Sequence, residues 1–274
     1  MVLVAEAPEG DSRERGDESS TSILTTKNHD VSCIWRMKKI QLKDRRVIVV
    51  GGSSGIGLKL CEELVTVGAD VVIASRSAEK LDATKRKLKD KVTTYELDAS
   101  DEQAVLHFFA HVGNFDHLIV TIKPDHMISE FVTTSICEIR KAFEAKFWGQ
   151  YYLARHCLPS ISKDGSILLT SGIASSRGYK GYSGIAAING AIESLVKTLA
   201  VELAPLRVNA VCPGFIERYR NDFERYDIIK TLGARPPLDR MGSHEEVSAA
   251  YAFLLQNQYA TGIVLPIDGG ELCA

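Results

Sequence analysis

Hydrophobic positions along the chain fall into two alternating kinds of segment. Short apolar runs typical of buried strands lie at 47–50, 71–74, 92–97, 118–121, 167–170, 208–212 and 263–266. Amphipathic stretches, with apolar residues spaced three and four apart, lie near 56–67, 78–88, 102–111, 136–158, 186–203 and 244–256. This alternation predicts an α/β fold with one doubly wound parallel sheet of seven strands and helices on both faces.

The N-terminal part of the chain has a different character. Residues 1–37 mix acidic and basic side chains with Ser and Gly and show almost no apolar periodicity, which predicts a disordered extension. Its apolar start is too short for a signal peptide, and its acidic residues argue against a transit peptide. Residues 38–274 are predicted to form a single domain.

The amino-acid composition limits the kinds of partner that we expect for this protein. The 274 residues carry a net charge of −2 with mixed signs, which favours neither nucleic acid nor an anionic membrane as a partner. No apolar run is long enough to predict a membrane span. The six cysteines are scattered without a CxxC pair, so we expect reduced thiols, a cytoplasmic protein and no metal site.

The most informative motif follows the first predicted strand. Three spaced glycines lie between that strand and an amphipathic helix. Such a turn lets the backbone approach a pyrophosphate, while the helix N-terminus offers free N–H groups and a favourable dipole. We therefore expect a Rossmann-type dinucleotide site that includes Gly51, Ser53, Ser54, Gly55, Ile56 and Gly57.

The loops after the second and third strands indicate which dinucleotide binds. Arg76 stands where an acidic residue would hold the adenosine ribose of NAD, and a guanidinium there suits a 2′-phosphate. We predict NADP(H), against the alternative that Arg76 is a solvated turn residue. Ser77 adds a hydroxyl and can cap the next helix. Asp98 is placed to accept the adenine amino group or to cap a helix.

These motifs together resemble the short-chain dehydrogenase/reductase family over about residues 39–270. The family pattern TGxxxGxG matches 50–57 with Val50 in the Thr position, RVNAVxPG matches 207–214, and TGxxxxxDGG matches 261–270. The resemblance implies cofactor contacts from Thr121, Asn189, Pro213, Gly214 and Ile216. It also implies a substrate lid near 215–238, and a homodimer or homotetramer formed through helices 136–158 and 186–203.

The family's catalytic residues are replaced. In an alignment without gaps, Ile185 and Asn189 occupy the Tyr and Lys positions, and Gly172 occupies the Ser position beside Ser171. Lys146 stands where the family has Asn. Reduction of a ketone produces an alkoxide that needs a proton donor, which Ile185 cannot be. The family mechanism in its usual form is therefore not supported.

Three alternatives remain open for the chemistry, with Lys146, Ser171 and Tyr182 as the candidate catalytic residues. Tyr182, three residues before the Tyr position, is either a displaced acid or a packing residue. Lys146 either supplies positive charge to the pocket or extends toward solvent. A substrate such as an iminium cation would need no acid. That last pattern resembles certain fungal indole-alkaloid enzymes of the family, which reduce an iminium-type intermediate and guide a Diels–Alder cyclisation.

The predicted lid suggests the kind of substrate. It contains the aromatic residues Phe215, Tyr219, Phe223 and Tyr226, which suit a bulky apolar or aromatic metabolite. We therefore expect an NADP(H)-dependent oxidoreductase that reduces C=O or C=N bonds, of the kind found in secondary metabolism. Two other classes stay open: a non-redox cyclase, Diels–Alderase or isomerase, and a nucleotide-sensing scaffold.

Overall fold

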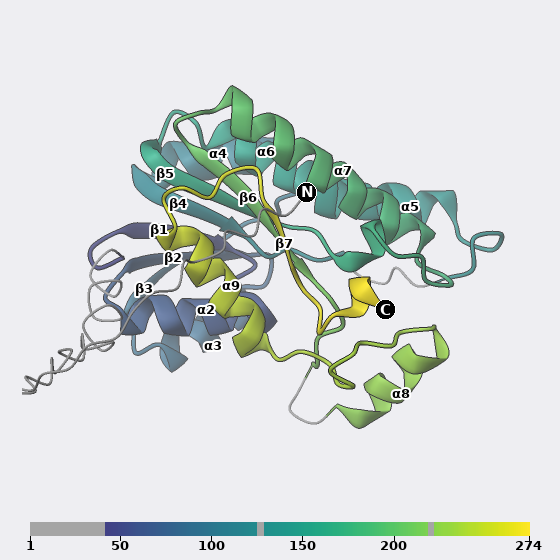
Figure 1. Cartoon of the computed structure of the whole chain (residues 1–274). Coiled ribbons are helices and arrows are strands. Elements are labelled where there is room, and N and C mark those ends of the chain that lie inside the picture. The colour runs from purple at the N-terminus through teal and green to yellow at the C-terminus, as the bar shows by residue number, and fades with distance from the viewer. Residues whose placement is uncertain (1–41, 125–128, 219–221) are drawn as a thin grey trace, which may run out of the picture.

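A seven-stranded parallel sheet organises the molecule (Figure 1). The computed structural model describes residues 42–124, 129–218 and 222–274. The strand order is β3-β2-β1-β4-β5-β6-β7. The strands are β1 (Arg46–Val50), β2 (Asp70–Ser75), β3 (Val92–Glu96), β4 (Phe115–Val120), β5 (Ile161–Thr170), β6 (Arg207–Pro213) and β7 (Val264–Ile267). The predicted doubly wound sheet is confirmed.

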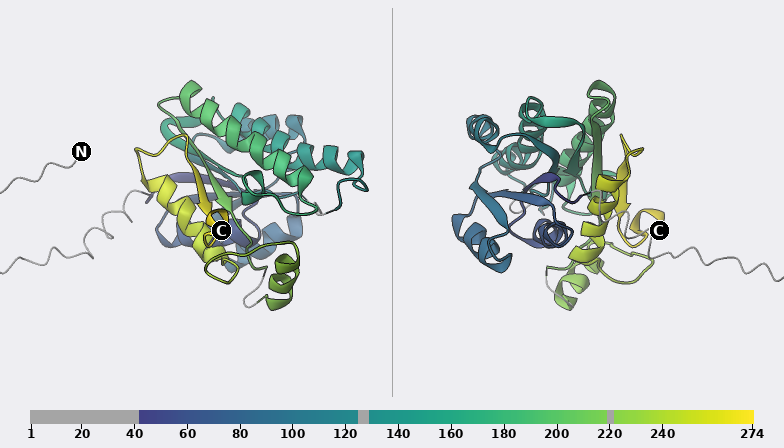
Figure 2. Two further views of the ribbon diagram at one scale, coloured as in Figure 1. Left: turned by 45° about the vertical axis from the view of Figure 1, so that its right-hand side comes forward. Right: turned by 90° about the vertical axis from the view of Figure 1, so that its left-hand side faces the viewer.

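Helices cover both faces of this sheet (Figures 1 and 2). One layer contains α2 (Gly55–Thr66), α3 (Ala78–Lys87) and α9 (His244–Gln256). The opposite layer contains α4 (Glu102–Val112), α5 (Ile136–Ala142), α6 (Gly149–His156) and α7 (Ser183–Glu202). Each layer closes a separate apolar core against the sheet.

Successive side chains of β1 point into opposite cores, which explains why the sequence of this strand is a continuous apolar run. Ile48 and Val50 point into the core beneath α4, α6 and α7, whereas Val47 and Val49 point into the core beneath α2 and α9. All four side chains are essentially inaccessible to solvent. A central parallel strand buried on both faces needs apolar residues at every position, so the period-two pattern is absent.

The predicted helix at 136–158 is interrupted. Between α5 and α6 the chain forms a π-helical segment, Phe143–Trp148, and the whole element ends at His156. Lys146 lies in this segment. A π-helical turn inserts one residue into the helical repeat and is frequent at functional sites. It therefore re-aims the residues of this stretch relative to an uninterrupted helix.

Other elements lie outside the predicted pattern. The predicted lid, 215–238, contains a helix, α8 (Phe223–Thr231), and short 3₁₀ turns form at Ile173–Ser175 and Glu271–Cys273. Tyr219 and the predicted N-terminal extension, 1–37, lie outside the described residues. Within the described residues, Ile229 of α8 is buried and Phe223 is exposed.

One described helix, α7, is long and apolar enough to cross a membrane by length and composition alone. The sequence pattern had predicted no such segment. The core helix of a globular protein passes the same test, and α7 buries Ile188, Ile192 and Val196 against the sheet. The finding is therefore weak evidence for a span.

Candidate active site

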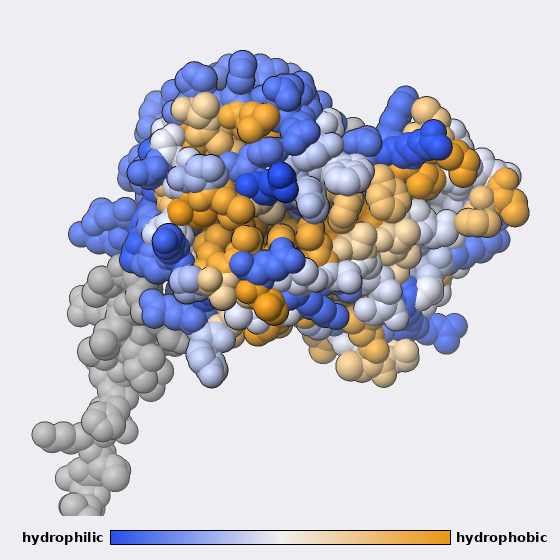
Figure 3. Space-filling model, turned by 90° about the horizontal axis from the view of Figure 1, so that it is seen from above, coloured by the Kyte–Doolittle hydropathy of each residue, from blue (hydrophilic) through white to orange (hydrophobic). Residues whose placement is uncertain are grey.

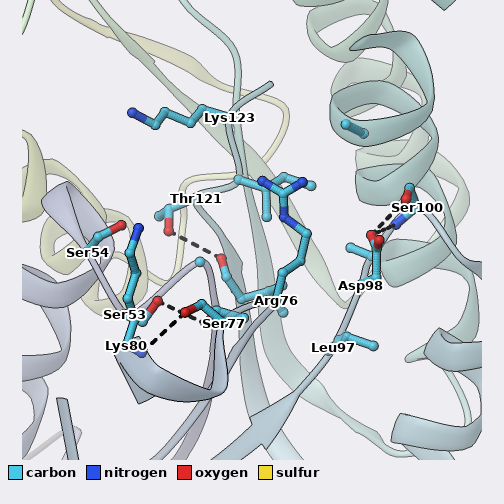
Figure 4. Close-up of a pocket in the computed structure, with 16 residues that line it drawn as sticks. Ser53, Ser54, Arg76, Ser77, Lys80, Leu97, Asp98, Ser100, Thr121 and Lys123 are labelled. Carbon is cyan, nitrogen blue, oxygen red and sulfur yellow. Dashed lines mark hydrogen bonds between the residues drawn. The ribbon is translucent and has the colours of Figure 1, made fainter. Parts of the chain in front are cut away.

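A cavity of about 180 Å³ opens at the carboxyl ends of β1 to β4 (Figure 4). Ligands of doubly wound sheets bind at this edge. Of the predicted cofactor residues, the structure brings seven together along its wall: Gly51, Ser53, Ser54, Arg76, Ser77, Asp98 and Thr121. The glycine turn, the β2 loop and the β3 loop therefore meet at one cavity.

The glycine turn is as tight as the motif requires. Gly51 has a φ of +91°, a conformation that residues with a β-carbon rarely adopt. A β-carbon on Gly57 would lie 2.5 Å from the Gly51 carbonyl oxygen and 2.5 Å from Thr121 Oγ1. Any larger residue would push the start of α2 away from the sheet. Close packing here keeps the N-terminus of α2 at the cavity.

Short polar side chains organise the part of the cavity formed by the loops after β2 and β3. Ser53 Oγ donates to Ser75 Oγ over 2.9 Å. Ser77 Oγ accepts from the Lys80 N–H, so its predicted role as the cap of α3 is confirmed. Asp98 accepts from the N–H and hydroxyl of Ser100 at 3.0 and 2.7 Å.

Asp98 does not cap α4; a nearby residue, Asp101, occupies the N-cap position instead. Asp101 accepts from the backbone N–H groups of Gln103 and Ala104 and so caps α4. Asp98 lies on the cavity wall, where its carboxylate is available to a ligand.

The other predicted cofactor residues do not line this cavity: Gly55, Ile56, Gly57, Asn189, Pro213, Gly214 and Ile216. Sequence reasoning in turn missed three polar lining residues, Lys80, Ser100 and Lys123. Two sequence signals were available for the lysines. Lys80 follows Arg76 by four residues, and Lys123 comes two residues after the end of a predicted strand.

A second set of polar groups lies in the protein interior. Lys146, only 5% exposed, donates from Nζ to the Ser171 carbonyl oxygen over 2.9 Å and to Asn189 Oδ1 over 2.7 Å. Asn189 Nδ2 donates to the Gly172 carbonyl oxygen over 3.0 Å. A β-carbon on Gly172 would lie 2.9 Å from Asn189 Nδ2. Glycine at 172 therefore leaves room for the amide that holds Lys146.

The surroundings of Lys146 are unusual for a cation. Burial lowers its pKa from 10.5 to about 8, and Cys212 and Glu193 oppose that shift. Among the described residues, no carboxylate lies within ion-pair distance of Nζ. An ammonium removed from water without a counter-ion is costly, and such perturbed groups concentrate at functional sites.

Ser171 adds a second unsatisfied group to this cluster. Its hydroxyl is buried beside the Cys212 thiol and has no hydrogen-bond partner of normal geometry within the described residues. Burial raises the pKa of Cys212 to about 12, so the thiol stays protonated near neutrality. The predicted residues Lys146 and Ser171 are thus brought together by one carbonyl contact.

Tyr182 lies in a different environment from Lys146. It occupies the N-cap position of α7, and its ring centroid is 5.6 Å from that of Tyr179 and 6.2 Å from that of Phe215. It packs with Ile185 against an apolar cluster that includes Ile173 and Ile229. Among the described residues no hydrogen bond joins Tyr182 to Lys146, and the three catalytic candidates are not linked by one hydrogen-bond network.

Comparison with known proteins agrees with this geometry. A profile of the family described as enoyl-(acyl carrier protein) reductase matches residues 50–271. A 3-oxoacyl-[acyl-carrier-protein] reductase from Mus musculus is 31% identical, over 83% of this chain and 98% of its own. The short-chain dehydrogenase/reductase ATR9 from Stachybotrys chlorohalonatus is 28% identical, over 84% of this chain and 97% of its own.

A solved structure adds a three-dimensional match. A small-chain dehydrogenase in complex with NADPH is 33% identical, with a TM-score of 0.70 over 85% of this chain and all of its own. Because the family profile covers most of the chain, the protein belongs to the short-chain dehydrogenase/reductase family of oxidoreductases.

Proposed function

We propose that this protein is an NADP(H)-dependent oxidoreductase that reduces a C=O or C=N bond in a bulky apolar or aromatic metabolite. The observation that carries the proposal is the cavity at the ends of β1 to β4, in which the glycine turn and Arg76 face the same space. An NADPH complex of a similar dehydrogenase supports the choice of cofactor.

The residues on the cavity wall suit the parts of NADP(H). The N-terminus of α2 at Ser54 suits the pyrophosphate, because its backbone N–H groups have no partner within the helix. The Arg76 guanidinium suits the 2′-phosphate, and Asp98 suits the adenine amino group. When bound, the nicotinamide supplies or accepts the hydride.

Lys146 is the group we assign to charge stabilisation. An ammonium has three N–H donors, and two of these are held by Ser171 and Asn189. The third is left to polarise a neutral acceptor or to donate a proton. With a pKa of about 8, Lys146 is protonated near neutral pH and can act as an acid there.

The apolar cluster beside this group suggests the substrate class. Tyr182, Ile185 and Phe215 pack at its edge, and Tyr226 of α8 joins them from the lid. These side chains offer flat apolar surface, which suits an aromatic metabolite better than a small sugar. A role in secondary metabolism and a cytoplasmic location belong to the same proposal.

Cofactor binding is the first test. We would titrate NADPH and NADH by nicotinamide fluorescence, with the wild type and with Arg76→Asp. We expect the wild type to prefer NADPH, and the substitution to weaken NADPH binding by roughly 2 kcal/mol, the scale of a charge-assisted hydrogen bond. Equal NADPH affinity in the two proteins would contradict the assignment of Arg76.

Turnover is the second test. Panels of aromatic ketones and cyclic imines would be incubated with NADPH, with nicotinamide absorbance and product mass both recorded. Reduction within either panel supports the oxidoreductase. Cyclised or isomerised product without NADPH consumption would instead indicate the non-redox alternative, and binding without any product would indicate a nucleotide-sensing scaffold.

A further inference from the structure

The cofactor cavity carries more positive charge than the motifs alone indicate. Besides Arg76, it is lined by Lys80 and Lys123, and Asp98 is its one acidic lining residue among the described parts of the chain. The two lysine ammonium groups make no ion pair with any described residue. Two cations that face one cavity without counter-ions repel each other and favour an anionic ligand.

Lys80 lies next to the predicted 2′-phosphate position. It occupies the first turn of α3, where the helix dipole disfavours a cation. Figure 4 shows the side chains of Arg76 and Lys80 rising on either side of Ser77. A phosphate seated above Ser77 would lie between a guanidinium and an ammonium, and would also offset the unfavourable helix position of Lys80.

Lys123 lines the cavity on the side formed by the loop after β4. It follows the end of β4 and extends, in Figure 4, toward the side of the cavity where Ser54 and the start of α2 lie. An anion at the N-terminus of α2 would therefore be approached by Lys123 from the β4 side. This is the position expected for a pyrophosphate, which every nicotinamide dinucleotide carries.

We propose that Lys80 and Lys123 are two separate phosphate ligands of the cofactor. Lys80, together with Arg76, brackets the 2′-phosphate and sets the preference for NADP(H). Lys123 closes over the pyrophosphate and contributes to the binding of any nicotinamide dinucleotide. This assignment rests on the proposed function, because it requires that the cavity hold such a cofactor.

The experiment measures NADPH and NADH affinities by fluorescence titration for the wild type, Lys80→Gln and Lys123→Gln. Glutamine keeps most of the side-chain length and removes the charge. For Lys80→Gln we expect NADPH binding to weaken about tenfold, with NADH binding unchanged. For Lys123→Gln we expect both cofactors to weaken by a similar factor of about ten.

Arg86→Gln is the matched control. It removes the same charge from an exposed position in the last turn of α3, outside the cavity, and should leave both affinities unchanged. Lys80→Arg and Lys123→Arg keep the charge and should retain most of the affinity. These conservative variants answer the question if a glutamine variant does not fold.

The outcomes distinguish a failure of the proposed function from a failure of the two lysine assignments. If the wild type binds neither cofactor, the proposed function fails, whatever the lysine variants do. If the wild type prefers NADPH but Lys80→Gln keeps that preference, the role of Lys80 is overturned. If Lys123→Gln weakens only NADPH, or neither cofactor, the pyrophosphate assignment of Lys123 is overturned.

Discussion

The side chains around Lys146 are those that the sequence alignment predicts to depart most from the family pattern. The gapless register predicts Ile185 and Asn189 at the family's Tyr and Lys positions, and the described buried cation, Lys146, lies in the π-helical segment. Asn189 helps to position Lys146, because it accepts a hydrogen bond from Lys146 and donates one to the Gly172 carbonyl oxygen. If that register is correct, the positive charge comes from another helix and is held by the residue predicted at the lysine position.

Substitution of Lys146 tests its chemical role. We expect Lys146→Met to reduce turnover far more than cofactor affinity, because the lysine is not among the residues that line the cavity. Loss of a positioned acid costs about a hundredfold to ten-thousandfold in rate. Ile185→Val, a change of one methylene in an apolar cluster, should change turnover little. Full turnover in Lys146→Met combined with its loss in Tyr182→Phe would make Tyr182 the acid.

The pH dependence of the free energy of unfolding should also reveal the lowered pKa of Lys146. Below about pH 8 the lysine is charged in both the folded and unfolded states, so its burial penalty is fully present. Between pH 8 and 10.5 the unfolded state holds a proton that the folded state has lost, so this group makes stability rise with pH.

Urea unfolding of the wild type and Lys146→Met across this pH range measures the effect. The free energy of unfolding of the wild type should rise relative to that of the variant as pH increases. Subtraction of the variant removes the titration of every other group. A constant difference between the two proteins would show that Lys146 keeps an ordinary pKa.

Whole elements differ in how far the sequence predicts them. The strands were predicted well, because burial on both faces forces continuous apolar runs such as Val47 to Val50. The π-helical segment Phe143–Trp148 was not, since one extra residue barely disturbs an apolar periodicity. Lys80 and Lys123 became candidates only in three dimensions, because their shared cavity joins segments 43 positions apart.

The C-terminal 3₁₀ turn connects two segments around the apolar cluster. Glu271 is fully buried and accepts from the Tyr179 hydroxyl over 3.0 Å and from the Arg235 N–H over 2.7 Å. Arg177 pairs with it at 2.9 Å. One carboxylate therefore connects the loop after β5 to Arg235, at the end of the predicted lid.

Glu271→Ala should therefore destabilise the protein. It leaves the buried Tyr179 hydroxyl and the Arg235 N–H without their acceptor and removes the ion pair of Arg177, which keeps its hydrogen bond to the backbone carbonyl of residue 271. We expect the loss to cost about 3 kcal/mol. Denaturant unfolding measures the loss, and proteolysis should reveal faster cleavage in the lid. Cys273→Ser, an exposed change in the same turn, is the control. Wild-type stability in Glu271→Ala would show that the three contacts contribute little.

The molecule as a whole presents an apolar surface on the layer that contains α5, α6 and α7. Figure 3, which views this layer from above, shows hydrophobic residues gathered across it. Exposed apolar side chains there include Ile136, Trp148, Leu158 and Val201. On α7, a β-carbon added at Gly190 would meet nothing within 4 Å, so a second helix can approach closely there. Large exposed apolar patches mark interaction surfaces.

We therefore predict that the protein is a dimer or tetramer that associates through α7 and its neighbours. Light scattering at micromolar concentration should give at least twice the chain mass of 30.1 kDa. Ala187→Glu places a charge on the exposed side of α7 and should shift the protein toward monomer. Ala83→Glu, the same substitution at an exposed position of α3, should leave the assembly intact. A monomeric wild type, or equal masses for both variants, would exclude this interface.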